Sequence, residues 1–206
     1  ACVTPVYEEH THAWARAGHR LRRLPTLQRA LAAATPNVLL CNPNNPTAVS
    51  LARDEVFAAA LQLEKRGGWL IVDEAFGDSV PENSVTAMAG SESAPNLIVL
   101  RSLGKFFGLA GARVGFVFGD AEKLGLLRES LGPWTVSHPA RVVARHALED
   151  SAWQAKTRSQ LAAGQRDAAQ RSMHTLKGTA GTIGASPLAT LAEAAEQALA
   201  QGQPDS

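Results

Sequence analysis

Four short runs of apolar residues recur along the chain, each bounded by polar or turn-forming residues. They span Asn37–Cys41, Trp69–Asp73, Leu97–Arg101 and Arg113–Gly119, lengths that are typical of strands. The segments between them are long enough for crossover connections. This alternation predicts an α/β fold in which a mostly parallel sheet lies between helical layers.

Helix boundary signals fall in two of the intervening segments. Ser50 is a candidate N-cap for a helix that continues to Glu64 and ends at Gly67-Gly68, because a serine hydroxyl caps free backbone amides and glycine ends helices. Asp120 is a candidate N-cap for a helix that runs to Ser130. Both expected helices follow strands, as the α/β pattern requires.

The pattern changes from Ser137 onward, where strand-like runs stop and an Ala-, Gln- and Arg-rich stretch predicts helix as far as Gly178. Ser186-Pro187 then resembles an N-cap followed by a first-turn proline. Apolar residues recur after it at helical spacing. They are Leu188, Leu191, Ala195 and Leu199. The sequence therefore predicts an α-helical C-terminal tail.

Composition narrows the classes of partner. The 206 residues are 45% hydrophobic and carry a net charge of +1, so no strong field favours nucleic acid or an anionic membrane. The longest apolar runs are far shorter than the roughly 20 residues of a membrane span. Two cysteines, Cys2 and Cys41, define no disulfide framework. We expect a cytoplasmic protein with a small-molecule partner. Ala1, the first residue, lies within a strand-like run, so we also expect that the sequence starts inside a longer domain.

Three motifs each follow a predicted strand. They are Asn42-Pro43-Asn44-Asn45-Pro46-Thr47, Asp73-Glu74-Ala75-Phe76 and Ser102-Leu103-Gly104-Lys105. Loops at the carboxyl ends of parallel strands line the ligand crevice of an open sheet. We therefore expect these motifs to converge on one site.

The residue types in these motifs favour pyridoxal-phosphate chemistry. Lys105 can form a Schiff base, and Asp73 can keep a pyridinium nitrogen protonated so that the ring accepts electrons. Arg113 and the Ser102 hydroxyl can bind a phosphate. Each residue taken singly also has a structural explanation: Asn45 can make a turn, Asp73 can cap a loop, and the two cations can be solvated.

The segment from Ser102 to Gly115, SLGKFFGLAGARVG, resembles the lysine segment of fold-type I aminotransferases. The resemblance implies the three-layer, mostly parallel sheet of a pyridoxal-phosphate transferase large domain, present in part over residues 1–165. It implies that Lys105 holds pyridoxal 5'-phosphate. It further implies that Asn45 bonds the phenolic oxygen, Asp73 the ring nitrogen and Arg113 with Ser102 the phosphate, while Tyr7 stacks on the ring.

Within that superfamily the segments RGGWLIVDEAF, VLRSLGKFFGLAGARVGF and LGPWTVS resemble L-threonine-O-3-phosphate decarboxylases of cobalamin biosynthesis. The alternative enzyme is a histidinol-phosphate aminotransferase. Phe76, where many aminotransferases carry tyrosine, and the LGPWTVS segment favour the decarboxylase. Ala48 departs from the family, which usually has glycine there, so the loop loses freedom at positive φ.

The resemblance implies a phosphorylated amino-acid substrate, a homodimer, and Lys105 as proton donor after carbon dioxide leaves. The family's first strand, its glycine- and serine-containing phosphate loop and the small domain with its carboxylate-binding arginine are not recognisable. We therefore expect weak cofactor binding and little decarboxylase turnover from this chain alone.

The tail carries a second resemblance. The segment from Met173 to Ala180, MHTLKGTA, resembles the phospho-accepting helix of histidine phosphotransfer domains. This implies a phosphotransfer-like fragment over residues 166–206, with His174 as the phosphorylated residue and a response-regulator receiver domain as partner. An HxxK pair is also common on a solvated helix, and a non-catalytic scaffold fragment is a third reading.

A group of acidic residues and histidines near the N-terminus could be taken for a metal site. Glu8, Glu9, His10 and His12 lie close in sequence, but helical neighbours one or two positions apart do not share a face. We therefore expect a surface helix and no metal site.

Overall fold

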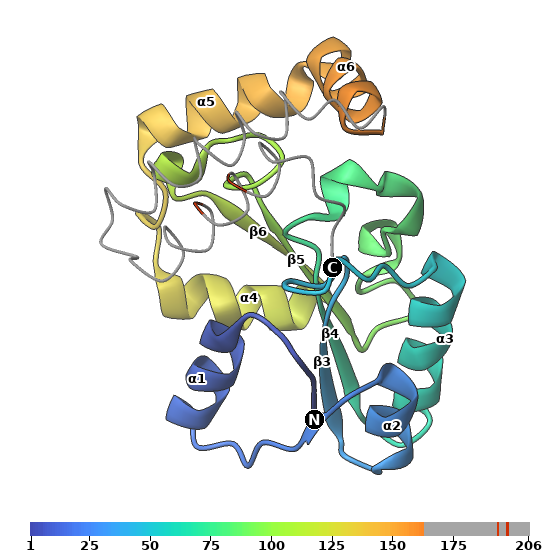
Figure 1. Ribbon diagram of the computed structural model, residues 1–206. Helices are drawn as coiled ribbons and strands as arrows, with labels where there is room; N and C mark the ends of the chain where they lie inside the picture. The colour runs from blue at the N-terminus through green and yellow to red at the C-terminus, as the bar shows by residue number, and fades with distance from the viewer. Residues whose placement is uncertain (163–192, 194–196, 198–206) are drawn as a thin grey trace. The chain divides into compact units, whose positions relative to one another are not determined.

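The computed structural model of the protein describes residues 1–162, 193 and 197 (Figure 1). Two units can be distinguished in it. The first comprises residues 1–102 and 115–135, and the second includes residues 103–114 and the described residues from Val136 onward. Each unit is considered by itself below.

A six-stranded sheet forms the centre of the first unit, in the order β2-β1-β3-β4-β5-β6. Neighbouring strands are parallel except for the pair β5–β6, which is antiparallel. The strands are β1 (Cys2–Val3), β2 (Arg23–Leu24), β3 (Asn37–Cys41), β4 (Trp69–Asp73), β5 (Leu97–Ser102) and β6 (Gly115–Phe118). The mixed, mostly parallel α/β sheet predicted from the sequence is confirmed.

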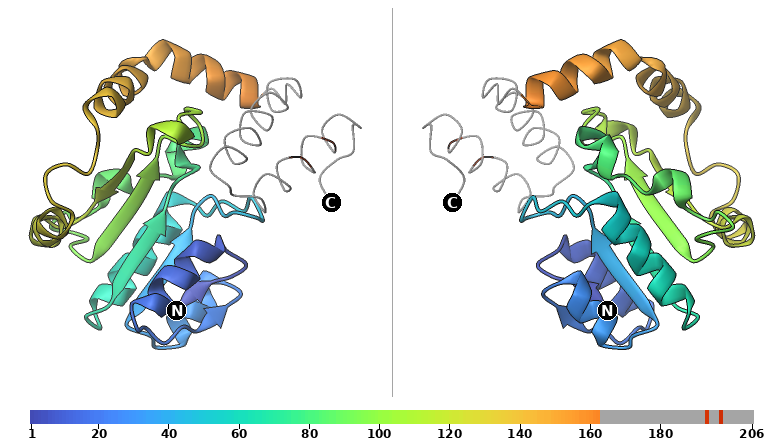
Figure 2. Two further views of the ribbon diagram at one scale, coloured as in Figure 1. Left: turned by 90° about the vertical axis from the view of Figure 1, so that its left-hand side faces the viewer. Right: turned by 90° about the vertical axis from the view of Figure 1, so that its right-hand side faces the viewer.

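Alternating side chains divide the sheet into two faces. On one face Val38, Leu40, Leu70 and Val72 pack with α2 (Leu27–Ala32) and α3 (Arg53–Glu64). On the other face Leu39 and Ile71 pack near Trp14 of α1 (Glu8–Arg16). Figures 1 and 2 show α1 and α3 on opposite sides of the sheet. Burial of both faces explains why the central strands are continuous apolar runs.

The helix boundaries agree with the sequence in part. Asp120 caps α4 (Ala121–Leu131), where its carboxylate accepts from the backbone amides of Glu122 and Lys123. The expected cap at Ser50 is wrong: α3 begins after Ala52, which makes no side-chain cap. The Ser50 hydroxyl instead accepts from the Asn83 amide at 3.0 Å.

The end of α3 lies close to the expected glycine pair. Gly67 adopts a φ of +69°, the left-handed conformation that follows many helices. A Cβ at Gly68 would lie 2.0 Å from the Pro36 carbonyl oxygen. Glycine at this point therefore permits the close approach of the chain that starts β4.

In the part of the second unit that the structure describes, two α-helices follow the loop of residues 103–114 in sequence. Its helices are α5 (His138–Glu149), capped by Ser137, and α6 (Ser151–Ala162). They are separate because Asp150 leaves helical geometry at ψ 73°, so the expected unbroken helix is interrupted. The short helix η4 (Ala110–Ala112) of the loop packs against α5.

A buried carboxylate fixes the connection after β4. The Glu74 side chain is fully buried and accepts from the Val85 backbone amide at 2.7 Å and the Thr86 hydroxyl at 2.8 Å. The Ser84 hydroxyl and Arg101, on β5, complete its partners. Charged acceptors make the stronger class of hydrogen bond, so this cluster ties the connection after β4 to β5. Three short helices follow in that connection: η1 (Gly77–Ser79), η2 (Pro81–Asn83) and η3 (Thr86–Met88).

Among the described residues, we find no helix with both the length and the apolar character needed to cross a lipid bilayer.

Replacing Glu74 by alanine should lower the free energy of unfolding by about 3 kcal/mol, because the Val85 amide and the Ser84 and Thr86 hydroxyls lose the buried carboxylate that accepts from them. Chemical denaturation measures the loss. Glu82→Ala, at an exposed position of η2, is the control and should change stability little. Equal stabilities of the two variants would contradict the anchoring role of Glu74.

Candidate functional site

Asp73 ends β4, at the carboxyl edge of the sheet. Its Oδ1 accepts from the Ala75 backbone amide at 2.8 Å, and its side chain is 14% exposed. The following residue, Glu74, is buried. Adjacent acids thus have different roles: Glu74 fixes the backbone, while Asp73 presents a held carboxylate at the position expected of a ligand-binding residue.

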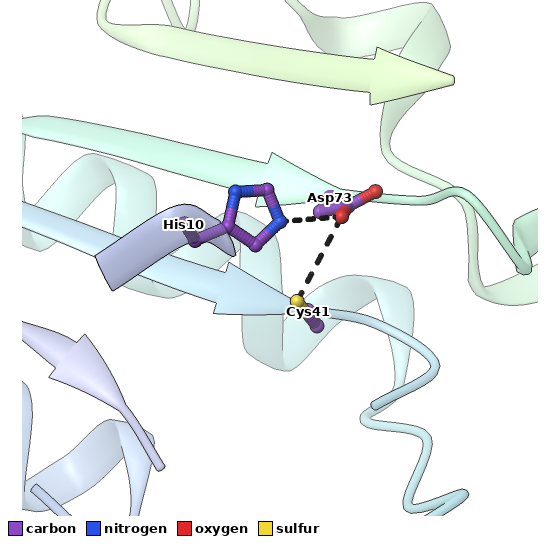
Figure 3. Close-up of side chains that lie close together, drawn as sticks. All are labelled: His10, Cys41 and Asp73. Atoms are coloured by element: carbon purple, nitrogen blue, oxygen red, sulfur yellow. Dashed lines mark hydrogen bonds and ion pairs between the residues drawn. The ribbon is translucent and has the colours of Figure 1, made fainter. Parts of the chain in front are cut away.

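His10 is the main residue of this site that sequence reasoning missed. Its Nε2 lies 2.6 Å from Asp73 Oδ2 (Figure 3), and because an ionised carboxylate only accepts, the imidazole is the donor. The prediction of a helix is confirmed, but the histidine points to β4 and is only 16% exposed. Its spacing of three from Tyr7, which places both on one side of a helix, was the available signal.

Cys41 ends β3 directly beside Asp73 in the parallel register. Its Sγ lies 3.9 Å from Asp73 Oδ2 (Figure 3). Burial raises the pKa of the Cys41 thiol well above its usual range, and the Asp73 charge raises it further. The expectation of a small buried thiol is confirmed for Cys41 and for Cys2.

Tyr7 and Asn45 lie at the same edge of the first unit. The Tyr7 ring packs edge-on against the His10 ring, with centroids 5.8 Å apart, so Tyr7 is linked through His10 to Asp73. The partly buried Asn45 side chain makes no hydrogen bond to another residue in the described part of the chain.

The loop that contains Asn45 has a backbone feature that its sequence indicated. Ala48 adopts a φ of +57°, a conformation that costs a non-glycine residue about 1–2 kcal/mol. The Ala48 amide donates to the Asn44 carbonyl at 2.8 Å, and the Asn44 side chain donates to the Pro5 carbonyl at 3.0 Å. These bonds hold the loop in the geometry that glycine would adopt freely.

An ion pair holds α1 against β2. Arg23 of β2 donates to both Glu8 oxygens, at 2.7 and 2.8 Å. Glu8 lies in the first turn of α1, where a negative charge is favourable, and also accepts from Thr11. Since His10 lies two residues further along the same helix, this pair helps to position the imidazole.

Lys105 lies in the loop of the second unit, three residues after β5 ends. Its carbonyl accepts from the Gly108 amide at 2.9 Å. The two residues after it are held by α6: Trp153 stacks on Phe107 and meets Phe106 edge-on, with centroid distances of 5.9 and 5.4 Å. Aromatic packing of this kind restrains the segment that carries the lysine.

Arg113 lies at the other end of the same loop and is exposed. Its φ of +54° is left-handed, so the chain turns sharply before β6. The Leu103 amide donates to the Val114 carbonyl at 3.3 Å, which closes the loop at its base. Ser102, the last residue of β5, pairs in register with Gly115 of β6.

Of the expected site residues, the first unit contains Tyr7, Asn45, Asp73 and Ser102, and the second contains Lys105 and Arg113. Contacts link Tyr7 to Asp73 through His10. The expected phosphorylation residue, His174, lies outside the described residues. Of the helix expected after Ser186, only Glu193 and Gln197 are described, and both are helical.

Comparisons with known proteins agree with the resemblance found in the sequence. The family model for aminotransferase class I and II matches residues 2–199, a range that extends into the tail that resembles a phosphotransfer domain. A threonine-phosphate decarboxylase from Pseudomonas aeruginosa is 49% identical over 149 residues, 72% of this chain and 44% of that protein. One from a Sinorhizobium species is 42% identical over the same shares.

Among solved structures, histidinol-phosphate aminotransferase from Sinorhizobium meliloti, in complex with pyridoxal-5'-phosphate, matches with a TM-score of 0.70 and 26% identity. The match covers 80% of this chain and 48% of that chain. The present chain thus spans about half the length of the relatives that it matches.

The Glu8–Arg23 pair should make stability depend on pH. Hydrogen bonds from Arg23 and then Thr11 lower the pKa of Glu8 from 4.5 to about 2. Because the folded pKa is the lower one, the stabilisation is complete above pH 4.5 and is lost as the pH falls towards 2. The measurement is the Tm of the protein and of Glu8→Gln across that interval: the variant should be less stable above it and equal to the parent below it.

Glu9→Gln is the matched control, since Glu9 is exposed on the same helix and its charged contact with His12 is long, at 3.9 Å. Added salt should shrink the effect of Glu8→Gln, because exposed ion pairs are screened. A Tm difference that persisted at low pH would show that Glu8 acts through packing instead.

Proposed function

The chain belongs to the class I and II aminotransferase family, and on that premise we propose that it binds pyridoxal 5'-phosphate and contributes to the decarboxylation of L-threonine O-3-phosphate to aminopropanol phosphate. That reaction supplies a building block of cobalamin. The proposed enzyme class is a pyridoxal-phosphate-dependent carboxy-lyase.

The identity to threonine-phosphate decarboxylases carries this proposal. At 49% and 42% over nearly three quarters of the chain, it exceeds the 34–39% identity over 54–55% of the chain to three histidinol-phosphate aminotransferases. Phe76 agrees with this choice, because it lacks the hydroxyl that many aminotransferases of this type place at that position. The second candidate, a histidinol-phosphate aminotransferase, has the structural match in its favour.

The chemistry of the site residues fits the cofactor. When bound, pyridoxal 5'-phosphate supplies an electron sink for the bond that breaks at the substrate's α-carbon. Asp73 is a carboxylate already held by His10 and by the Ala75 amide, so it can keep a ring nitrogen protonated without reorienting. The Asn45 amide, which has no hydrogen-bond partner among the described residues, offers a donor for a phenolic oxygen, and the Tyr7 ring offers a stacking surface.

His10 has a positioning role in this proposal. Its hydrogen bond to Oδ2 and the Ala75 bond to Oδ1 restrain both oxygens of Asp73. The imidazole also borders Tyr7. Loss of His10 would remove the 2.6 Å hydrogen bond to Oδ2 and the edge contact of the Tyr7 ring, and would leave the carboxylate held mainly through Oδ1.

The loop of residues 103–114 supplies the reactive amine and a phosphate-binding cation. Lys105 Nζ would hold the cofactor covalently until the substrate amine displaces it, and the freed amine would then return a proton to the substrate carbon after carbon dioxide leaves. Arg113 offers a forked donor that matches phosphate geometry, with the Ser102 hydroxyl beside β6 as a further donor. The substrate would be a small phosphorylated amino acid.

A product assay separates the two enzyme candidates. A decarboxylase releases carbon dioxide from L-threonine O-3-phosphate and needs no amino acceptor, whereas an aminotransferase converts histidinol phosphate only when an oxoacid accepts the amino group. Since the chain spans about half of its relatives, we expect low turnover, and the ratio of the two rates is the deciding quantity.

Two further proposals concern partners. A homodimer is proposed from the family, and a receiver domain is proposed as partner of His174 from the HxLKG resemblance. Sedimentation of the full chain and transfer of phosphate from a labelled receiver domain would test them in turn.

Lys105→Ala should abolish a borohydride-reducible adduct with pyridoxal phosphate, because the adduct requires this amine. Reduction, digestion and mass spectrometry locate the adduct. Lys123→Ala is the control: this lysine lies on α4, 5.9 Å from the centre of the Trp69 ring, and its loss should leave the adduct unchanged. An adduct that survives in Lys105→Ala would contradict the assignment.

Arg113→Gly should weaken cofactor binding by about 10- to 100-fold, the equivalent of a charge-assisted hydrogen bond, while leaving the Tm equal or higher. Glycine adopts the φ of +54° at this position without strain. The substitution should therefore weaken cofactor binding while it keeps or raises the stability of the fold. Titration of visible absorbance gives the Kd. Arg113→Lys keeps the positive charge but not the forked donor geometry. Its Kd should therefore lie between those of the parent chain and Arg113→Gly.

A further inference from the structure

Three different metal-ligating atoms meet at the carboxyl edge of the sheet. His10 Nε2, Cys41 Sγ and one Asp73 carboxylate oxygen all lie within 4.8 Å of one another (Figure 3). They come from α1, β3 and β4, so their convergence is a product of the fold. The proposed cofactor chemistry uses Asp73 and, through it, His10, but assigns nothing to the Cys41 thiol.

We propose that these three residues form a binding site for a zinc-class divalent cation, with water as the fourth ligand. One nitrogen, one sulfur and one oxygen donor suit zinc or cobalt better than magnesium or calcium, which prefer oxygen alone. Three protein ligands and an open fourth position are typical of exchangeable zinc sites.

The distances are compatible with tetrahedral coordination. Bonds of about 2.0–2.3 Å place neighbouring ligand atoms about 3.5 Å apart. The separation of 3.9 Å between Cys41 Sγ and Asp73 Oδ2 is close to this value. The 2.6 Å separation between His10 Nε2 and Asp73 Oδ2 must widen by about 1 Å, which a rotation of the His10 side chain provides.

The strands hold two of the ligands rigidly. Cys41 and Asp73 are directly paired residues of adjacent parallel strands. Oδ1 of Asp73 is occupied by the Ala75 amide, which leaves Oδ2 to face the ion. The Tyr7 backbone also forms a hydrogen bond to Cys41. Such outer contacts orient metal ligands and strengthen binding.

Charge and access also fit. When the ion binds, the thiol proton leaves to solvent and the imidazole proton resides on Nδ1, so that a thiolate and a carboxylate neutralise the dication. His10 lines a cavity of about 350 Å³ in the first unit, together with Trp14 and Leu39. An ion can therefore approach from the His10 side while Cys41 remains buried.

Occupation of this site has a consequence that depends on the proposed function. The ion and the ring nitrogen of pyridoxal phosphate require the same carboxylate, Asp73, so each should exclude the other. Zinc would then act as a competitive inhibitor of cofactor loading, at a site built from residues of the chain itself.

Cobalt titration of the metal-free full chain, without cofactor, tests the site. We expect visible tetrahedral ligand-field bands and a thiolate-to-cobalt charge-transfer band that saturate with one ion per chain and disappear when zinc is added. Cys41→Ser should abolish the charge-transfer band, and His10→Ala should weaken binding at least about tenfold.

The matched controls are Cys2→Ser and His12→Ala, since the chain has only two cysteines and His12 is exposed on the same helix. Both should bind cobalt as the parent does. Circular dichroism establishes that each variant is folded; if Cys41→Ser is not, His10→Ala decides. No charge-transfer band in the parent, or a band that is lost in Cys2→Ser and kept in Cys41→Ser, would overturn the proposal.

Competition is measured separately. Excess zinc should reduce the borohydride-trapped adduct in the parent chain and reduce it much less in Cys41→Ser. If the parent forms no adduct even without zinc, the proposed function fails while the cobalt result stands on its own. If the adduct forms and zinc has no effect on it, the exclusion between ion and cofactor is wrong.

Discussion

The burial of Glu74 is the interaction on which the geometry of this edge depends. A charged group inside a protein is costly unless hydrogen bonds replace its water, and here the connection after β4 supplies them from Ser84, Val85 and Thr86 while β5 supplies Arg101. Arg101 also pairs with Asp78. The end of β4 is therefore held by several hydrogen bonds, and these bonds restrain Asp73, the last residue of the strand.

Rigidity at Asp73 matters because the groups around it belong to separate elements. His10 comes from α1 and Cys41 from β3. A rigid backbone at Asp73 maintains the 2.6 Å contact to His10 and the 3.9 Å contact to Cys41. The Glu8–Arg23 pair acts in the same direction, since it holds the helix that carries the histidine. Electrostatic groups act most effectively when they are oriented before a ligand arrives.

Much of the fold could be predicted because burial on both faces leaves a clear pattern. β3 and β4 have the bounds expected from their apolar runs. The Ser50 cap failed because a hydroxyl near a helix start has other partners in three dimensions, here Asn83. β2 has only two residues, too few for a periodic signal. His10 was missed because helical periodicity shows which residues share a face of a helix. It does not show which strand end that face packs against.

The loop from Leu103 to Val114 has a consequence for how this fold can diverge. Its ends are joined at the base by a backbone hydrogen bond, and an internal bond from the Leu109 amide to the Leu103 carbonyl tightens it further. Lys105 and Arg113 therefore lie in one loop that local backbone bonds close and that Trp153 packs against. The sequence of the sheet can therefore change during evolution while the amine and the guanidinium are inherited together within one loop.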